Sequence, residues 1–122
     1  MNITVAESRV MDLLWARSPQ TSEELIAELA PAQDWSEATI RTLLSRLVKK
    51  GMVSTTAEGR RFLYSPQVRR EDYLLSESEG LIDRLFEGRV SPFLVQFSAR
   101  KKLSREDISE LRRLIDELDD GD

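Results

Sequence analysis

The hydrophobic pattern of this 122-residue sequence changes from helical to strand-like at Gly51. In the segment 36–50, apolar residues recur at spacings of three and four, which predicts an amphipathic helix with one buried face. The residues of this apolar stripe are Ile40, Leu43, Leu44 and Leu47. Ser36 is a suitable N-cap, and Gly51 suits the left-handed conformation that often follows the last turn of a helix. A helix with well-marked ends is therefore expected directly before the change of period.

Beyond Gly51, apolar and polar residues alternate as they do in β-strands. The alternation is found in the segments 52–56 and 61–65, and residues 57–60 between them have the composition of a turn. Two short alternating segments joined by a turn predict a β-hairpin. Arg60 and Arg61 are expected near its tip.

Two more helices are predicted on the amino-terminal side of this unit. Each begins with the Thr-x-x-Glu spacing of a capping box, in which the two side chains bond each other's backbone N–H groups, and the boxes start at Thr4 and Thr21. Ser18-Pro19 is expected to end the first helix and Pro31 the second, because proline has no backbone N–H to donate. Three helices followed by a hairpin have the order of a winged helix-turn-helix, whose third helix is placed for the major groove of DNA.

Residues 69–122 return to a helical period but are too few to form a core of their own. Three helices are expected there, starting near Arg70, Ser91 and Ser104. Their apolar stripes need either the winged domain or a second chain, and a homodimer is the simpler solution for a protein that binds symmetric DNA. The candidate dimerisation residues are Leu81, Leu85, Ile108, Leu111, Ile115 and Leu118.

The expected fold class is thus mainly α with a small β-hairpin wing. A winged helix-turn-helix DNA-binding domain is expected over residues 1–68, and a helical dimerisation segment over residues 69–122. The chain contains no cysteine and no histidine, which excludes disulfides, thiolate or imidazole metal sites and histidine-based acid–base catalysis. We therefore expect neither an enzyme nor a metal or cofactor site. No apolar run is long enough to span a bilayer and no secretory signal precedes the first helix, so a cytoplasmic location is expected.

The net charge of −4 is distributed unevenly along the chain. Residues 1–35 carry −4, residues 36–70 carry +6 and residues 71–122 carry −6. A strongly basic segment inside an acidic protein indicates a surface that faces a polyanion.

The face of the 36–50 helix opposite its apolar stripe is expected to hold no carboxylate, and we call it the reading face. It consists of Ala38, Thr42, Ser45 and Lys49, flanked by Thr39, Arg41 and Arg46. An ordinary solvated helix face mixes both charge signs, so double-stranded DNA is the expected partner. The full set of candidate DNA-binding residues is Ser36, Ala38, Thr39, Arg41, Thr42, Ser45, Arg46, Lys49, Lys50, Arg60 and Arg61.

The chemistry of these side chains leaves part of their roles open. Arg41 and Arg46 have planar donor groups that suit either guanine edges or phosphates, and the sequence does not choose between the two. The lysines 49 and 50 and the hairpin arginines 60 and 61 suit the phosphate backbone.

Two stretches of the chain closely resemble the BlaI/MecI/CopY family of penicillinase and methicillin-resistance repressors. They are Ala6-Glu7 with the pattern Val10-Met11-x-Leu13-Leu14-Trp15, and the continuous run from Trp35 to Gly51. The resemblance extends over nearly the whole chain, including the hairpin strand that ends in Phe62-Leu63-Tyr64-Ser65. It implies a homodimeric winged-helix repressor that binds a palindromic operator, and it leaves antibiotic-resistance, copper-handling and respiration genes open as targets.

The same resemblance implies a way in which repression ends. In the antibiotic-resistance members, a membrane-bound sensor protease leads to cleavage at an Asn-Phe bond in the dimerisation segment, and the matching pair here is Gln96-Phe97. Two departures limit the transfer. Ala38 stands where some members carry lysine, and the absence of cysteine excludes the metal-sensing tail of the copper-responsive members.

Two other functions remain open at this point. A ligand-responsive winged-helix repressor would need an aromatic or polar cluster in the carboxy-terminal segment, and none stands out in the sequence. A winged-helix module used only for protein association would leave the reading face without DNA, which the basic segment 36–70 argues against.

Overall fold

The computed structural model describes residues 2–121, which divide into two compact units, Met1–Ser78 and Glu79–Asp122. Each unit is described separately below. None of the helices in residues 2–121 has the length and apolar content needed to cross a bilayer.

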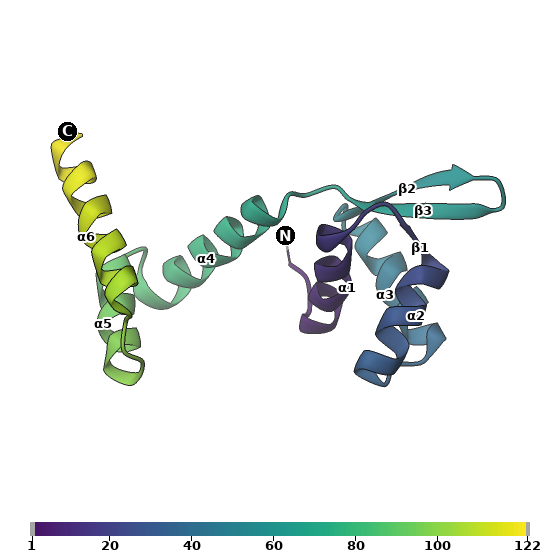
Figure 1. The fold of residues 1–122 in the computed structure, drawn as a ribbon, viewed down its shortest axis with the longest axis horizontal. Coiled ribbons are helices and arrows are strands. Elements are labelled where there is room, and N and C mark those ends of the chain that lie inside the picture. Colours follow the sequence, from purple (N-terminus) through teal and green to yellow (C-terminus); the bar gives the residue numbers. More distant parts are fainter. Residues whose placement is uncertain (1, 122) are drawn as a thin grey trace. The chain divides into compact units, whose positions relative to one another are not determined.

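The first unit contains three helices and a three-stranded sheet, and it has the winged-helix fold that the sequence predicts (Figure 1). Its elements are α1 (Val5–Ala16), β1 (Gln20–Thr21), α2 (Ser22–Gln33), α3 (Glu37–Lys49), β2 (Val53–Glu58) and β3 (Arg61–Pro66), followed by the first part of α4 (Arg70–Phe86). The strands are antiparallel in the order β1-β3-β2. We call the β2–β3 hairpin the wing.

The structure confirms the expected starts of the three helices and the expected end of α3. The capping boxes at Thr4 and Thr21 are complete in both directions, and the Ser36 hydroxyl accepts a hydrogen bond of 3.1 Å from the Thr39 N–H. Gly51 follows α3 with a φ of +77°, the left-handed conformation expected for it. These caps give each helix a defined start, so its apolar stripe faces a fixed direction.

One hydrophobic core joins the three helices to the base of the wing. Its buried members are Val10, Met11, Leu14, Leu25, Leu29, Ile40, Leu43, Leu44, Leu47, Met52 and Val53. All four residues of the α3 apolar stripe are among them, so the opposite face of α3 is turned outward.

Three features of this unit differ from the prediction. Pro31 does not end α2, which continues to Gln33. Because proline has no backbone N–H, the last turn of the helix lacks one hydrogen bond. The Asp34 N–H nevertheless donates to the Ala30 carbonyl. The hairpin turn is shorter than residues 57–60, because Glu58 pairs with Arg61 and leaves a two-residue turn that starts at Gly59 with a φ of +62°. Strand β1 was not predicted, since two residues are too few to show a period.

The second unit contains the rest of α4 together with α5 (Val90–Arg100) and α6 (Arg105–Asp120). The Ser104 hydroxyl caps α6 by accepting a 3.0 Å hydrogen bond from the Asp107 N–H, as expected. Helix α5 begins one residue before Ser91, without a side-chain cap. No side chain among residues 79–121 is fully buried, so this unit has no closed core of its own.

The first turn of α4 is attached to the first unit through α1. The Trp15 indole N–H donates a 2.9 Å hydrogen bond to the Val68 carbonyl, and the rings of Trp15 and Tyr73 lie 5.4 Å apart. These contacts place the division between compact units at Ser78, ten residues after the end of the expected DNA-binding domain. The functional assignment of 1–68 and 69–122 stays a prediction.

Candidate nucleic-acid interface

Helix α3 presents all of its predicted DNA-binding residues to solvent. Ser36, Ala38, Thr39, Arg41, Thr42, Ser45, Arg46 and Lys49 are exposed, and the apolar stripe behind them is packed in the core. The geometry therefore brings these eight positions together on one accessible surface. Their role in DNA binding stays a prediction.

Arg46 and Lys49 are the cations that this surface leaves free. Within residues 2–121, neither side chain makes an ion pair or a side-chain hydrogen bond. Both lie in the last turn of α3. Their charges are therefore available to an external anion without breaking an existing contact.

Arg41 differs because a carboxylate already holds it. Its Nε and Nη2 lie 3.2 and 2.9 Å from Glu37 Oε1, and its Nη1 donates to the Ser22 hydroxyl at 3.3 Å. The expectation that the reading face is free of carboxylates is thus wrong at its Arg41 flank. Glu37 is favoured in the first turn by the helix dipole, and from there it reaches the residue four positions later. The pair orients the guanidinium in the absence of a partner, but both side chains are exposed, so the pair is weak.

Lys50 is also committed, and it turns away from the reading face. Its ammonium donates to Glu7 Oε1 at 2.7 Å and to the Asn2 carbonyl at 3.0 Å. The Glu7 side chain is completely buried, whereas that of Lys50 is 36 % exposed. Glu7 Oε2 has no hydrogen-bond partner among the described residues, so Lys50 supplies the main compensation for a buried charge. We therefore assign Lys50 to the stability of the fold and take it off the proposed DNA surface.

The environment of Glu7 favours its ionised form. Burial alone would raise the pKa of this carboxyl, but the hydrogen bonds from Lys50 and Thr4 and the positive charge of Lys50 outweigh burial and lower the pKa below 4.5. Sequence analysis recognised Glu7 only as a capping residue. Its pairing with a lysine 43 positions away has no local signal.

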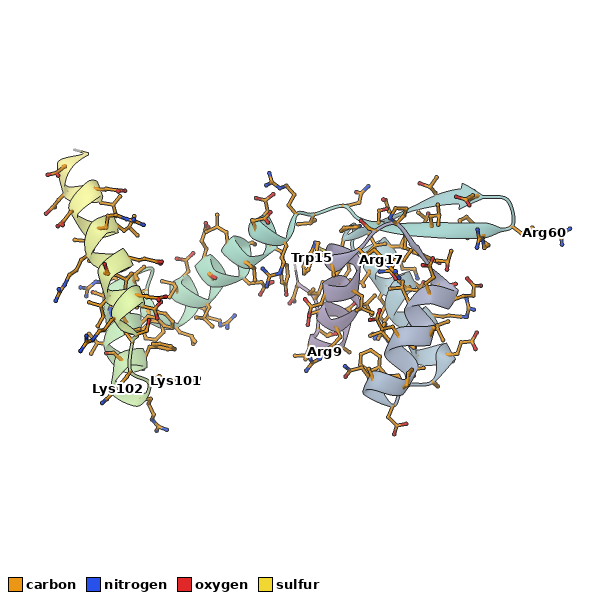
Figure 2. All side chains as sticks on the ribbon, viewed as in Figure 1. Arg9, Trp15, Arg17, Arg60, Lys101 and Lys102 are labelled. Carbon is orange, nitrogen blue, oxygen red and sulfur yellow. The ribbon has the colours of Figure 1, made fainter. Side chains whose placement is uncertain are left out.

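The two wing arginines are in different situations. Arg60 lies in the turn at the tip of the wing and projects beyond it (Figure 2). Arg61 pairs with Glu58 across the turn at 3.3 Å, with both side chains mostly exposed. An exposed pair of this kind is weak, so it gives little resistance to a competing phosphate.

In the second unit, the predicted dimerisation residues are largely exposed. Leu85, Ile115 and Leu118 are 59, 57 and 64 % exposed, Leu81 and Ile108 are near 36 and 38 %, and Leu111 is half-buried. Leu114 is 49 % exposed beside them on α6 and was not predicted. Gln96 and Phe97 lie inside α5, and the Phe97 side chain is 40 % exposed.

The second unit also contains an aromatic cluster that sequence analysis did not recognise. The ring of Phe93 lies 5.6 Å from that of Phe86 and 6.0 Å from that of Phe97. The signal was the spacing of four between Phe93 and Phe97, with Phe86 near the end of the preceding helix.

Comparison with known proteins gives the family of this chain. A family model described as penicillinase repressor matches residues 3–117. The penicillinase repressor of Bacillus licheniformis is 36 % identical over 115 residues, which are 94 % of this chain and 90 % of the relative. The methicillin resistance regulatory protein MecI of Mammaliicoccus sciuri is 31 % identical over 113 residues, covering 93 % and 92 % of the two chains.

A solved structure agrees with these relatives. The solution structure of the monomeric form of BlaI from Bacillus licheniformis, in complex with the blaP half-operator, is 41 % identical and covers 60 % of this chain and 89 % of that one, with a TM-score of 0.54. The chain therefore belongs to the penicillinase repressor family of winged-helix, DNA-binding transcriptional repressors, which are regulators rather than enzymes.

Proposed function

We propose that this protein is a cytoplasmic, homodimeric repressor that binds a palindromic operator through α3 and the wing. The observation that carries the proposal is the exposed face of α3, on which Arg46 and Lys49 have no side-chain partner among residues 2–121, while the opposite face is buried. A cationic, exposed helix of a winged-helix fold suits the major groove. The related BlaI was solved with a half-operator, which supports one recognition unit per half-site.

The two classes of contact have different consequences. Lys49 and Arg60 suit phosphate, which positions the protein without reading sequence. Arg46 suits a guanine edge, where its two parallel donors match the O6 and N7 acceptors. In the unbound protein, Arg41 is paired with Glu37. On binding DNA, it either leaves this carboxylate for a base or a phosphate, or contacts DNA while it is still paired with Glu37.

Dimerisation is supported by the open second unit. No side chain among residues 79–121 is buried, and leucines and isoleucines on α4 and α6 are exposed. A second copy of the chain would bury this apolar surface, which favours a dimer. Joining two winged units also converts the second half-site contact into an intramolecular event, which raises the overall affinity. Release then follows from losing this connection, for example by cleavage at Gln96-Phe97 after a signal from a membrane-bound sensor protease.

The experiment compares binding to three duplexes: an inverted repeat with half-sites about one helical turn apart, a single half-site, and unrelated DNA. We expect the strongest binding to the inverted repeat and a steep fall of affinity with salt, because phosphate contacts release counterions. Footprinting of the DNA upstream of the gene that encodes this protein identifies the natural site. Equal affinity for all three duplexes, or binding that is independent of salt, would contradict the proposal, and no binding to any of them would favour a protein-association module.

A further inference from the structure

A cleft of about 330 Å³ lies between α3 and the wing. Arg41, Val48 and Lys49 line it from α3, and Thr55, Phe62 and Tyr64 line it from the two wing strands. None of its lining residues is acidic, and two are cations. The cleft therefore combines apolar side chains with Lys49, a cation that has no side-chain partner among the described residues, and with Arg41, which is paired with Glu37.

Phe62 is the unusual member of this cleft because it is a large apolar residue that is 56 % exposed. Val48 on the facing helix is 37 % exposed. The wing register explains why they share the cleft: Phe62 pairs with Ala57 and Tyr64 with Thr55, and alternate residues of a strand point to the same side. Tyr64 packs against the core, but Phe62 is not part of the core cluster. Folding of the unit thus leaves a large apolar side chain outside the core and beside the reading face.

A DNA strand matches this combination of groups. The sugar–phosphate backbone alternates an apolar deoxyribose face with an anionic phosphate, and the cleft offers apolar side chains flanked by cations. A neutral peptide would leave the cationic side of the cleft unpaired. Phe62 and Val48 line the same cleft beside the reading face, so a strand bound there would cover both.

We propose that the cleft between α3 and the wing holds one strand of the operator backbone, with Phe62 and Val48 against deoxyribose and Lys49 on the adjoining phosphate. The inference rests on the proposed DNA binding and adds two apolar positioning residues to it. Phe62 sets how far the wing lies from the strand that α3 follows. It affects affinity for any duplex, because every sequence has the same backbone.

The proposal separates apolar from ionic contacts in a measurable way. Removing a cation that neutralises a phosphate lowers the slope of log affinity against log salt by about one. Removing Phe62 takes away apolar contact only, so it releases no counterion and the slope is unchanged.

The test measures the affinity of Phe62→Ala for a half-site and for unrelated DNA at several salt concentrations, with thermal unfolding recorded for each variant. We expect both affinities to fall about tenfold, with an unchanged salt slope and an unchanged Tm. Phe62→Leu should recover most of the loss. Lys49→Ala should lower the slope, and Val5→Ala, at an exposed valine on α1, should change neither quantity.

Val48→Ala tests the same contact from the α3 side of the cleft. Alanine is a better helix former than valine, so this variant should fold normally and bind both duplexes a few times more weakly. Wild-type affinity in Phe62→Ala and Val48→Ala, or a salt slope that falls in Phe62→Ala as it does in Lys49→Ala, would overturn the inference. If the unsubstituted protein does not bind duplex DNA, the proposed function itself fails.

Discussion

The Lys50 ammonium lies 2.7 Å from Glu7 Oε1, so the residue that directly follows α3 is held by a carboxylate of α1. The preceding lysine, Lys49, makes no such contact within residues 2–121 and faces outward. Two adjacent lysines therefore serve different purposes. One compensates a buried charge, and the other is available to DNA.

Lys50→Ala should destabilise the fold, because it leaves the Glu7 carboxylate buried and unpaired. Partial exposure of Lys50 reduces the effect from that of a fully buried pair, and we expect a loss of about 2 kcal/mol in the free energy of unfolding. Urea denaturation measures this loss. Lys49→Ala is the matched control and should unfold as the unsubstituted protein does, while binding DNA more weakly. If Lys50→Ala and Lys49→Ala were equally stable, the structural role assigned to Lys50 would be contradicted.

The stability of the protein should fall in acid partly through Glu7. Hydrogen bonds and the charge of Lys50 hold the folded-state pKa of Glu7 below the ordinary value of 4.5, so its ionised form stabilises the fold above that pH. The contribution is lost as the pH falls from 4.5 through the lower folded-state pKa. Glu7→Gln should be less stable at neutral pH and should lose less stability on acidification. Free energies of unfolding in urea, measured across this range, give the difference, and parallel pH curves for the two proteins would contradict it.

Arg46→Ala should weaken operator binding by about 1 to 3 kcal/mol and leave the helical circular-dichroism signal unchanged. The side chain is exposed and has no partner among the described residues, so only contacts to DNA are lost. If Arg46 reads a base, the loss is larger for the operator than for unrelated DNA; if it binds phosphate, the two losses are equal. Titration of both duplexes decides between these roles. Unchanged operator affinity would place the reading face elsewhere.

Leu118→Asp should prevent dimerisation without unfolding the chain. Leu118 is 64 % exposed in the single chain, so a carboxylate there costs little until a second copy covers it. Ser109→Asp adds the same charge on the other side of α6 and should leave the dimer intact. Sedimentation at several protein concentrations measures both. A double variant, Leu111→Asp with Leu118→Asp, that still sediments as a dimer would move the interface away from α6.

A chain truncated after Gln96 should be monomeric and should fail to hold the operator at concentrations where the full chain saturates it. The truncation removes α6 with its apolar residues, so the two half-site contacts are no longer linked. Binding to a single half-site should be nearly unaffected, because the winged unit is complete. Phe97 is partly exposed but lies within a helix, so cleavage of the intact chain requires local opening of α5. A truncated protein that saturates the operator normally would exclude this route of release.

The local structure of the winged unit could be predicted from the amino-acid sequence alone. The α3 stripe, the three caps at Thr4, Thr21 and Ser36, and the turn to Gly51 depend on neighbours within a few positions, and each is present in the structure. Helical and strand periods are local properties, so they are visible before the chain folds. The basic character of the 36–70 segment is likewise a matter of composition.

The availability of the predicted cations, in contrast, depends on how the helices pack. Lys50 was indistinguishable from Lys49 in sequence, but packing of α1 against α3 brings Glu7 beside one of them and not the other. The exposed ring of Phe62 was equally invisible, since an alternating strand pattern does not say which apolar residue the core leaves uncovered. Pairings between distant segments depend on how helices and strands pack, and that information lies in the contacts of the folded chain rather than in any local pattern.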